Sequence, residues 1–244
     1  MELQSRSVEV SGVSARWRTA GTGSPLVLVH GLAGSWRWWR PVLPLLSAEH
    51  SVHLLDLPGF GQRPRLRAFQ LDRTLDWLAA WARAAELGPA DVVGHSLGAV
   101  LCTRLAVRHP ETVRRLVLVA PAGMPRRSAA GSALPLALEL LRSRPRLLTL
   151  LARDSIRSGP FTIGTAARAT VTADLRVDLP RVEAPTLVVL GERDVLVPTR
   201  DGAELAGALR DGRVIVIDGA GHVPMVDTPE AFSQALLSFL RESD

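Results

Sequence analysis

The feature that most constrains the fold of this 244-residue chain is a repeated unit of apolar run, Gly- or Pro-marked loop and helical pattern. The apolar runs are continuous rather than alternating, which is typical of parallel strands covered on both faces. The alternation of strands and helices predicts a doubly wound α/β sheet. The six runs lie at 26–29, 52–55, 92–93, 116–119, 186–190 and 214–217. Helical patterns lie at about 70–86, 97–109, 199–209 and 229–241.

Two segments depart from this repeat. Residues 7–10 and 13–19 predict an antiparallel hairpin at the start of the chain. Residues 122–178 show no strand pattern; they hold apolar helical stretches that are rich in Arg and interrupted by Pro. We therefore expect a core domain of residues 1–121 and 179–244, with 122–178 inserted as a helical cap.

The composition is that of an ordinary globular protein, with 47% hydrophobic and 22% charged residues. The net charge is +5 and all 29 basic residues are Arg, but they form no single dense tract. Nucleic-acid binding would favour clustered Arg with interleaved aromatic residues, so we expect no nucleic-acid partner. No apolar run reaches about 18 residues, so no membrane-spanning segment is expected.

Compartment and cysteine chemistry follow from two simple features. Cys102 is the single cysteine, so no internal disulfide can form, as in proteins of a reducing compartment. It falls on an apolar helical stretch, where a small buried side chain is expected. The first residues lack a basic stretch followed by an apolar one, so we expect no signal peptide and a cytoplasmic location.

The stretch "DVVGHSLGAV" places Ser96 between Gly94 and Gly98, at a predicted strand-to-helix turn. Such a turn crowds the positions two residues to either side, which must therefore be small. It also projects the hydroxyl above the carboxyl ends of the strands, where open α/β sheets bind ligands. A Gly-containing turn with an idle Ser is the alternative, and the strand–helix context favours a nucleophile.

A serine hydroxyl needs a base, and the base needs an orienting acid. His222 is the best base, because it lies in a Gly-rich loop between the last strand and the final helix. Asp194, directly after the strand at 186–190, is the best acid; Glu192 and Asp218 are the runners-up. His50, His53 and His109 are expected on the surface or in strands, and His95 is expected to turn away into packing. The chain order is then Ser, Asp, His.

The tetrahedral oxyanion of acyl transfer needs backbone N–H donors. We expect one from Leu97, at the start of the helix after Ser96. The second is expected from Leu32, in the loop "VHGLAGSW" that follows the strand at 26–29. Gly31 and Gly34 allow this loop to approach Ser96 closely.

These pieces together resemble the α/β-hydrolase superfamily. The matching motifs occur in the order of that family: "HGLAG", "DLPGFG", "GHSLG", "GERDVLVP" and "GAGHVP". The resemblance implies an eight-stranded, mostly parallel sheet flanked by helices, and a cofactor-free, metal-free Ser-His-Asp site under a helical cap. Ser96 stands where the similar dehalogenases and epoxide hydrolases carry Asp. Val223 stands where carbon–carbon bond hydrolases usually carry Trp.

The predicted activity is hydrolysis of a carboxylic ester or lactone, a small-molecule substrate, through an acyl-enzyme. The acyl pocket is expected between the cap and the sheet. Its candidate lining residues are Trp36, Met124, Val223, Leu134, Leu138 and Leu148. The arginines of the cap either form a solvated helix face or attract an anionic acyl chain.

Other functions remain open from the sequence alone. The same triad serves carbon–carbon bond hydrolases, thioesterases and perhydrolases, and some members of the superfamily are slow-turnover receptors of small molecules. The natural substrate is not determined, and the protein is expected to be a monomer or a homodimer.

Overall fold

The structure is a computed structural model and describes residues 2–60, 68–124 and 145–242. Its centre is an eight-stranded sheet with the strand order β1-β2-β4-β3-β5-β6-β7-β8. β2 is antiparallel to both of its neighbours, β1 and β4, and the pairs from β4 to β8 are parallel. The strands are β1 Gln4–Val10, β2 Val13–Ala20, β3 Ser24–Val29, β4 His50–Leu55, β5 Ala90–His95, β6 Val113–Val119, β7 Thr186–Gly191 and β8 Gly212–Ile217. The predicted fold class, the hairpin and all six apolar runs are confirmed.

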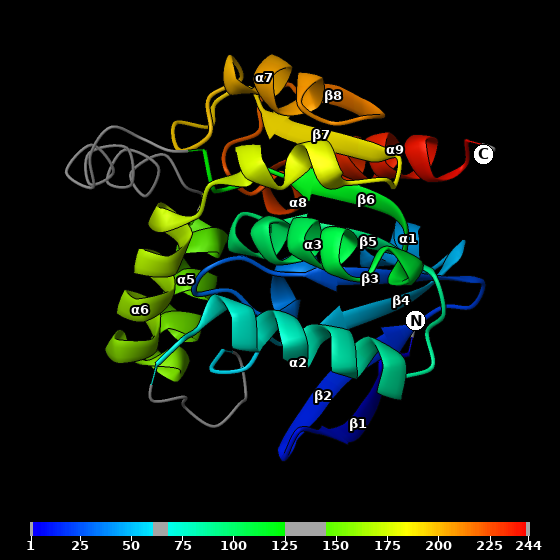
Figure 1. Cartoon of the computed structure of the whole chain (residues 1–244), viewed down its shortest axis with the longest axis vertical. Coiled ribbons are helices and arrows are strands. Elements are labelled where there is room, and N and C mark those ends of the chain that lie inside the picture. The colour runs from blue at the N-terminus through cyan, green and yellow to red at the C-terminus, as the bar shows by residue number, and fades with distance from the viewer. Residues whose placement is uncertain (1, 61–67, 125–144, 243–244) are drawn as a thin grey trace.

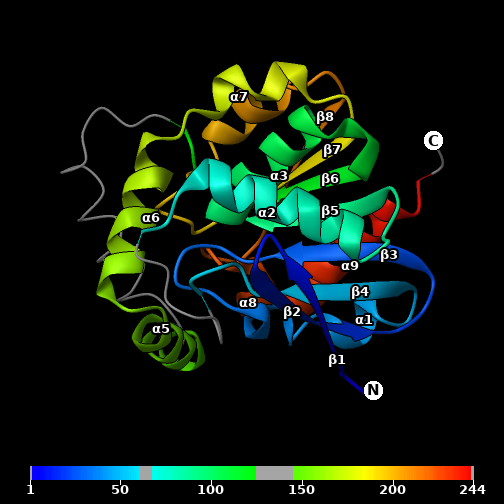
Figure 2. The ribbon, with the colours of Figure 1, turned by 60° about the horizontal axis from the view of Figure 1, so that its bottom comes forward.

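Helices cover both faces of this sheet (Figures 1 and 2). One face carries α2 (Leu71–Ala84), α3 (Leu97–Arg108) and α7 (Asp201–Gly207). The other carries α1 (Leu43–Leu46), α8 (Pro224–Asp227), α9 (Pro229–Leu240) and the 3-10 turn η1 (Trp36–Trp39). Alternate residues of one strand enter the two cores: Val27 and Val29 join the first, Leu26 and Leu28 the second. This alternation explains why the runs are apolar at every position.

The last apolar run behaves differently from the others. We expected it to be covered on both faces, but β8 is an edge strand, and Val214, Ile215 and Val216 are 43%, 37% and 41% exposed. The expectation was wrong for β8. A continuous apolar run does not reveal whether a strand lies inside the sheet or at its edge, where its residues are less covered. Pairing with β7 fixes its position instead.

Two helices of the predicted cap lie beyond the carboxyl ends of the parallel strands (Figure 1). They are α5 (Pro145–Ser158) and α6 (Pro160–Thr172), and the short 3-10 turns η4 (Leu175–Val177) and η5 (Leu179–Arg181) lead from them back to β7. The buried residues of α5 follow a helical stripe that includes Leu147, Asp154 and Ser158. The proposed boundaries of a separate cap domain, residues 122 and 178, stay a prediction.

Candidate active site

Ser96 occupies the sharp turn between β5 and α3. Its backbone has φ 52° and ψ −112°, an uncommon conformation for a residue with a side chain. A Cβ on Gly94 would lie 2.5 Å from the carbonyl oxygen of Gly98, and one on Gly98 would lie 2.5 Å from that of Val29. Both contacts are with backbone atoms, which cannot move aside cheaply. The two glycines are therefore required for the turn to pack against β3.

Three side chains from separate loops converge at this turn. The Ser96 Oγ lies 3.2 Å from the His222 Nε2, and the His222 Nδ1 lies 2.9 Å from the Asp194 Oδ2. Because the Asp194 carboxylate accepts the Nδ1 proton, the unprotonated Nε2 can accept the hydroxyl proton of Ser96. Only 12% of the His222 side chain and none of the Asp194 side chain is exposed. This arrangement can turn a hydroxyl into a nucleophile.

The carboxylate of Asp194 is held in its charged form. Burial alone would raise its pKa, but the neighbouring His222 and backbone donors outweigh burial and lower the pKa overall. The donors are the N–H groups of Leu196 and Val197, which lie 2.7 and 2.9 Å from the Asp194 Oδ1. Sequence reasoning ranked Glu192 and Asp218 behind Asp194. Glu192 instead accepts a hydrogen bond from the Gly219 N–H, and Asp218 is exposed.

The two predicted oxyanion donors lie on either side of Ser96. Leu97 is the first residue of α3, and the first N–H groups of a helix have no partner within it. Leu32 follows Gly31, at which a Cβ would lie 3.1 Å from the Ser96 Cβ, so this loop runs beside the nucleophile. His30 anchors the loop: its Nε2 accepts from the Leu57 N–H and its Nδ1 donates to the Gly31 carbonyl. Burial lowers the pKa of His30, consistent with this neutral form.

His95 has a role that the sequence did not reveal. The prediction that it turns into packing is incomplete, because its Nε2 also donates a hydrogen bond of 2.9 Å to the carbonyl oxygen of His222. The two imidazole rings meet edge to face, with centroids 5.0 Å apart. Burial lowers the pKa of His95 to about 3, so it is neutral near pH 7. His95 thus holds the backbone of His222 without competing as a base.

The candidate pocket residues lie in different surroundings. Val223 is buried beside His222, and Met124 packs against the core on the α2 and α3 side. The Trp36 ring is buried between two guanidinium groups, with the Arg18 and Arg37 Cζ atoms 4.3 and 4.9 Å from its centroid. Leu134 and Leu138 lie outside the described residues.

Leu148 does not point into the core. It is 39% exposed, whereas its neighbour Leu147 is 2% exposed and joins the apolar cluster that contains Trp36 and Trp38. Leu147, Leu151 and Asp154 are spaced four and then three residues apart, which places them on one face of a helix. This spacing is the sequence pattern that would have identified the buried side of α5.

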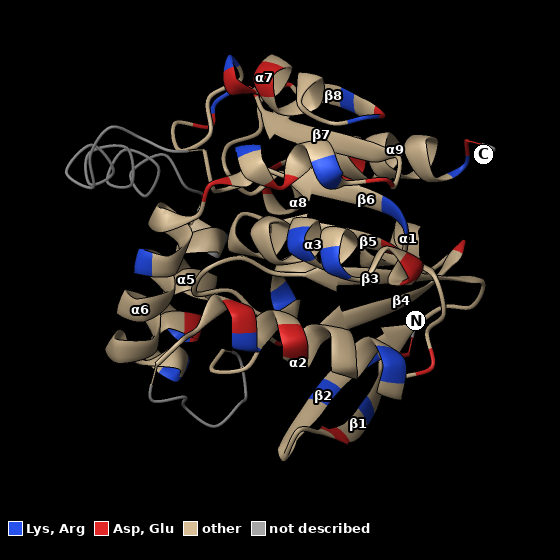
Figure 3. Ribbon diagram, viewed as in Figure 1, with Lys and Arg blue, Asp and Glu red and all other residues tan. Residues whose placement is uncertain are grey.

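The charges of the cap are partly visible in the structure. Figure 3 shows basic and acidic residues distributed over the described chain, and the sequence of α5 holds Arg153 and Arg157 as well as Asp154. Burial lowers the pKa of Arg37, and the positive charges of Arg153 and Arg157 on α5 lower it further. The Arg37 guanidinium on η1 is therefore within electrostatic range of these two arginines of α5. The cap arginines at 126, 127, 142 and 144 lie outside the described residues.

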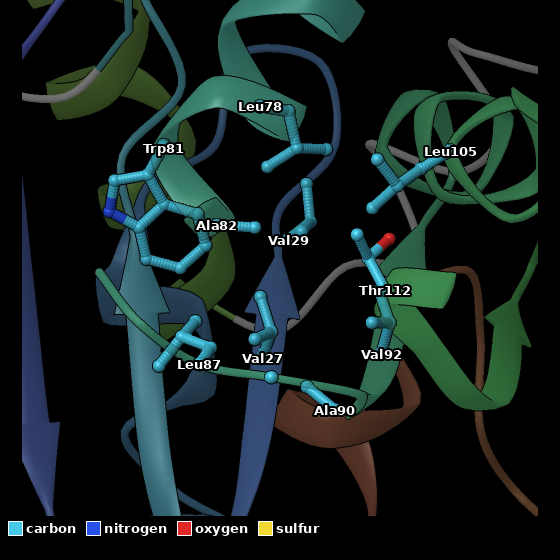
Figure 4. A pocket seen from close by; sticks show the side chains of 11 residues that line it. Val27, Val29, Leu78, Trp81, Ala82, Leu87, Ala90, Val92, Leu105 and Thr112 are labelled. Atoms are coloured by element: carbon cyan, nitrogen blue, oxygen red, sulfur yellow. The ribbon is translucent and has the colours of Figure 1, made fainter. Parts of the chain in front are cut away.

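The cavity drawn in Figure 4 is separate from this site. It lies between α2, α3 and the sheet, and Val27, Val92 and Leu78 are among its apolar lining residues. Its volume of about 10 Å³ leaves room for about one water molecule and is too small for an acyl chain. A larger hollow of about 440 Å³ lies over β1, β2 and β4. Neither includes Ser96, Asp194 or His222 in its lining.

The described part of the chain holds neither a metal-binding cluster nor a membrane-spanning helix. Within residues 2–60, 68–124 and 145–242, no group of three or more His, Cys, Asp or Glu side chains is arranged to hold a metal ion. The helices of the same residues include none with the length and apolar character needed to span a membrane.

Fold and site together define a hydrolase of the α/β type. The sequence matches the alpha/beta hydrolase family over residues 26–235, and the chain belongs to this family. A pimeloyl-[acyl-carrier protein] methyl ester esterase of Aeromonas hydrophila is 30% identical, over 90% of this chain and 96% of that protein. A 2-hydroxymuconate semialdehyde hydrolase of Pseudomonas sp. CF600 is 30% identical, over 98% and 94%.

Among solved structures, a thermophilic esterase from Thermogutta terrifontis superimposes with a TM-score of 0.83. The alignment covers 98% of each chain at 22% identity, a likeness that concerns the fold.

Proposed function

We propose that the protein hydrolyses a carboxylic ester or a lactone through an acyl-enzyme on Ser96. The observation that carries this proposal is the relay of two hydrogen bonds, from Ser96 to His222 and from His222 to Asp194. The esterases among the relatives support the same class of substrate.

In the first half of the reaction, His222 removes the hydroxyl proton as Ser96 attacks the carbonyl carbon. The N–H groups of Leu32 and Leu97 stabilise the oxyanion, and His222 then protonates the leaving alcohol. Asp194 keeps the imidazole in the required tautomer. In the second half, His222 activates a water molecule, which releases the acid and restores Ser96.

Hydrolysis of a carbon–carbon bond is the second candidate, since one relative is named a 2-hydroxymuconate semialdehyde hydrolase. The same Ser96 and His222 would serve that reaction on a diketone-like substrate. Val223, in place of the Trp usual in such enzymes, favours the ester reaction. Thioester hydrolysis, perhydrolysis and a slow-turnover receptor function are distinguished from ester hydrolysis by product analysis and by turnover number.

The test is a series of p-nitrophenyl esters from acetate to decanoate, together with the methyl esters of the same acids. Wild-type protein and Ser96→Ala are assayed side by side. We expect many turnovers by the wild type and a loss of roughly a thousandfold or more in the variant. Wild-type protein that cleaves no ester, but cleaves a carbon–carbon substrate or retains a ligand unchanged, would reject the proposal.

A further inference from the structure

Asp154 is a charged residue in an unexpected place. It lies on α5, outside the sheet, yet it is fully buried. Burying a carboxylate is costly unless hydrogen bonds stabilise its charge. Its Oδ2 accepts two such bonds, from the Ser35 hydroxyl at 2.7 Å and from the Trp38 indole N–H at 3.2 Å. A single oxygen of α5 is thus bonded to two residues of the core.

Both donors belong to loop 30–39, which also carries Leu32. The core side of this loop is held by Asp56, which accepts a 2.8 Å bond from the Trp36 N–H, and by the bond between His30 and the Leu57 N–H. Asp154 holds the same loop from α5. The loop is therefore fixed between the core and α5, and the position of its backbone depends on both.

Trp38 connects Asp154 to the catalytic histidine as well. Its ring lies beside that of His95, with centroids 5.7 Å apart, and His95 donates to the carbonyl oxygen of His222. A continuous series of contacts therefore runs from Asp154 through Trp38 and His95 to His222. Such a series can transmit a displacement of α5 to the loop and to the base.

We propose that Asp154 is a positioning residue, which sets the oxyanion-binding geometry of loop 30–39 through its bonds to Ser35 and Trp38. The inference rests on the proposed function, because it assigns Leu32 as an oxyanion donor. If the Leu32 N–H is displaced by a fraction of an ångström, the protein binds the substrate as before, but this N–H stabilises the oxyanion less. The effect should then fall on kcat and leave KM nearly unchanged.

The experiment compares Asp154→Ala, Asp154→Asn and Ser35→Ala, with p-nitrophenyl butyrate as substrate. In Asp154→Ala both bonds are lost, and we expect kcat to fall about 10- to 100-fold with KM within about twofold. In Asp154→Asn the amide oxygen can accept both bonds, so kcat should stay within about threefold of the wild type. In Ser35→Ala one bond is lost, and we expect an intermediate decrease of kcat. The double variant of Ser35→Ala and Asp154→Ala should be no slower than Asp154→Ala alone.

Ser158→Ala is the matched control. Ser158 lies on the same buried stripe of α5, one turn further on, and among the described residues its hydroxyl bonds only to the Asp154 backbone carbonyl. It should retain wild-type kcat. An equal decrease in Ser158→Ala, or a rise in KM with kcat retained in Asp154→Ala, would overturn the proposal. If Asp154→Ala does not fold, full activity in Ser35→Ala would overturn it.

The rate at which an alkyl fluorophosphonate modifies Ser96 separates this proposal from the proposed function. In this reaction the Ser96 Oγ forms a bond to phosphorus, its hydroxyl proton passes to His222, fluoride leaves, and a phosphoryl oxygen takes the oxyanion position. Wild-type protein that is modified but cleaves no ester would reject the ester function alone; the modification rates of the same variants would still test Asp154. Absence of modification in the wild type would overturn both.

Discussion

Backbone packing holds Ser96 on the core side of the site, whereas side-chain hydrogen bonds hold α5 on the cap side. At Gly94 and Gly98 an added Cβ would meet backbone atoms at 2.5 Å, so the turn tolerates no side chain at either position. Where α5 meets loop 30–39, Asp154 contacts the core through Ser35 and Trp38. Close contacts between backbone atoms leave no room for an added side chain, whereas hydrogen bonds between side chains can be removed one at a time by substitution. The core side should therefore respond to substitution steeply and the cap side gradually.

The largest effect is expected at the acid of the relay. Asp194→Asn removes the charge that holds His222 in its tautomer, and kcat should fall about 10³- to 10⁴-fold. Asp218→Asn, at an exposed acid of the neighbouring loop, is the control and should remain near wild type. Steady-state kinetics on a p-nitrophenyl ester measure both. A loss below about tenfold in Asp194→Asn would show that another carboxylate orients the base.

Substitution of glycine compares the two regions directly. Gly98→Ala forces a Cβ against the carbonyl oxygens of Val29 and His30, at 2.5 and 2.6 Å. We expect activity to fall about 100-fold and the free energy of unfolding to fall by about 1–3 kcal/mol. In Gly164→Ala, on α6, the new Cβ has no heavy atom of the described chain within 4 Å, so stability should stay the same or rise by up to about 1 kcal/mol.

Urea unfolding and ester kinetics give both quantities. Equal losses in Gly98→Ala and Gly164→Ala would remove the distinction between a backbone-packed core side and a tolerant cap side.

A smaller effect is expected at His95. His95→Gln weakens the support of the His222 backbone, and we expect kcat to fall about 3- to 10-fold with a smaller change in KM. The matched variant is His53→Gln, on β4, which is also buried but lies in the lining of the hollow over β1, β2 and β4. It should retain its activity. Loss of activity in both variants would point to a general effect of removing buried imidazoles.

Acidification is expected to change the stability of the fold rather than the chemistry of the site. Burial lowers the pKa of His95 to about 3 and that of His53 to about 4, below the ordinary value of 6.5. Between its lowered pKa and the ordinary value of 6.5, each histidine is protonated in the unfolded chain but not in the folded chain. Stability is therefore complete above pH 6.5 and decreases as the pH falls. Each histidine contributes up to about 1.4 kcal/mol per pH unit in that window.

Urea unfolding of the wild type at pH 7.5, 6 and 5 measures this slope. His53→Gln and His95→Gln should each show a shallower slope than the wild type. A slope that is the same in all three proteins would contradict the burial of these two rings.

Much of the fold could be predicted because it depends on local patterns. Continuous apolar runs located the strands, and the Gly-x-Ser-x-Gly spacing located the turn at Ser96. The prediction for β8 was wrong because burial depends on which strands are neighbours. Leu147 and Leu148 are both apolar and adjacent, so their sequence does not distinguish them; only the packing of α5 determines which one turns inward.

The sequence by itself determined the strand and helix order and the residue types for a relay of Ser96, Asp194 and His222, since both are written in short-range patterns. The tertiary structure decided that the His95 ring supports His222, 127 positions away along the chain, and that Asp154 is bonded to Ser35, 119 positions away. Such contacts arise because separate elements meet at the carboxyl ends of one sheet. No local pattern encodes which side chains face each other there.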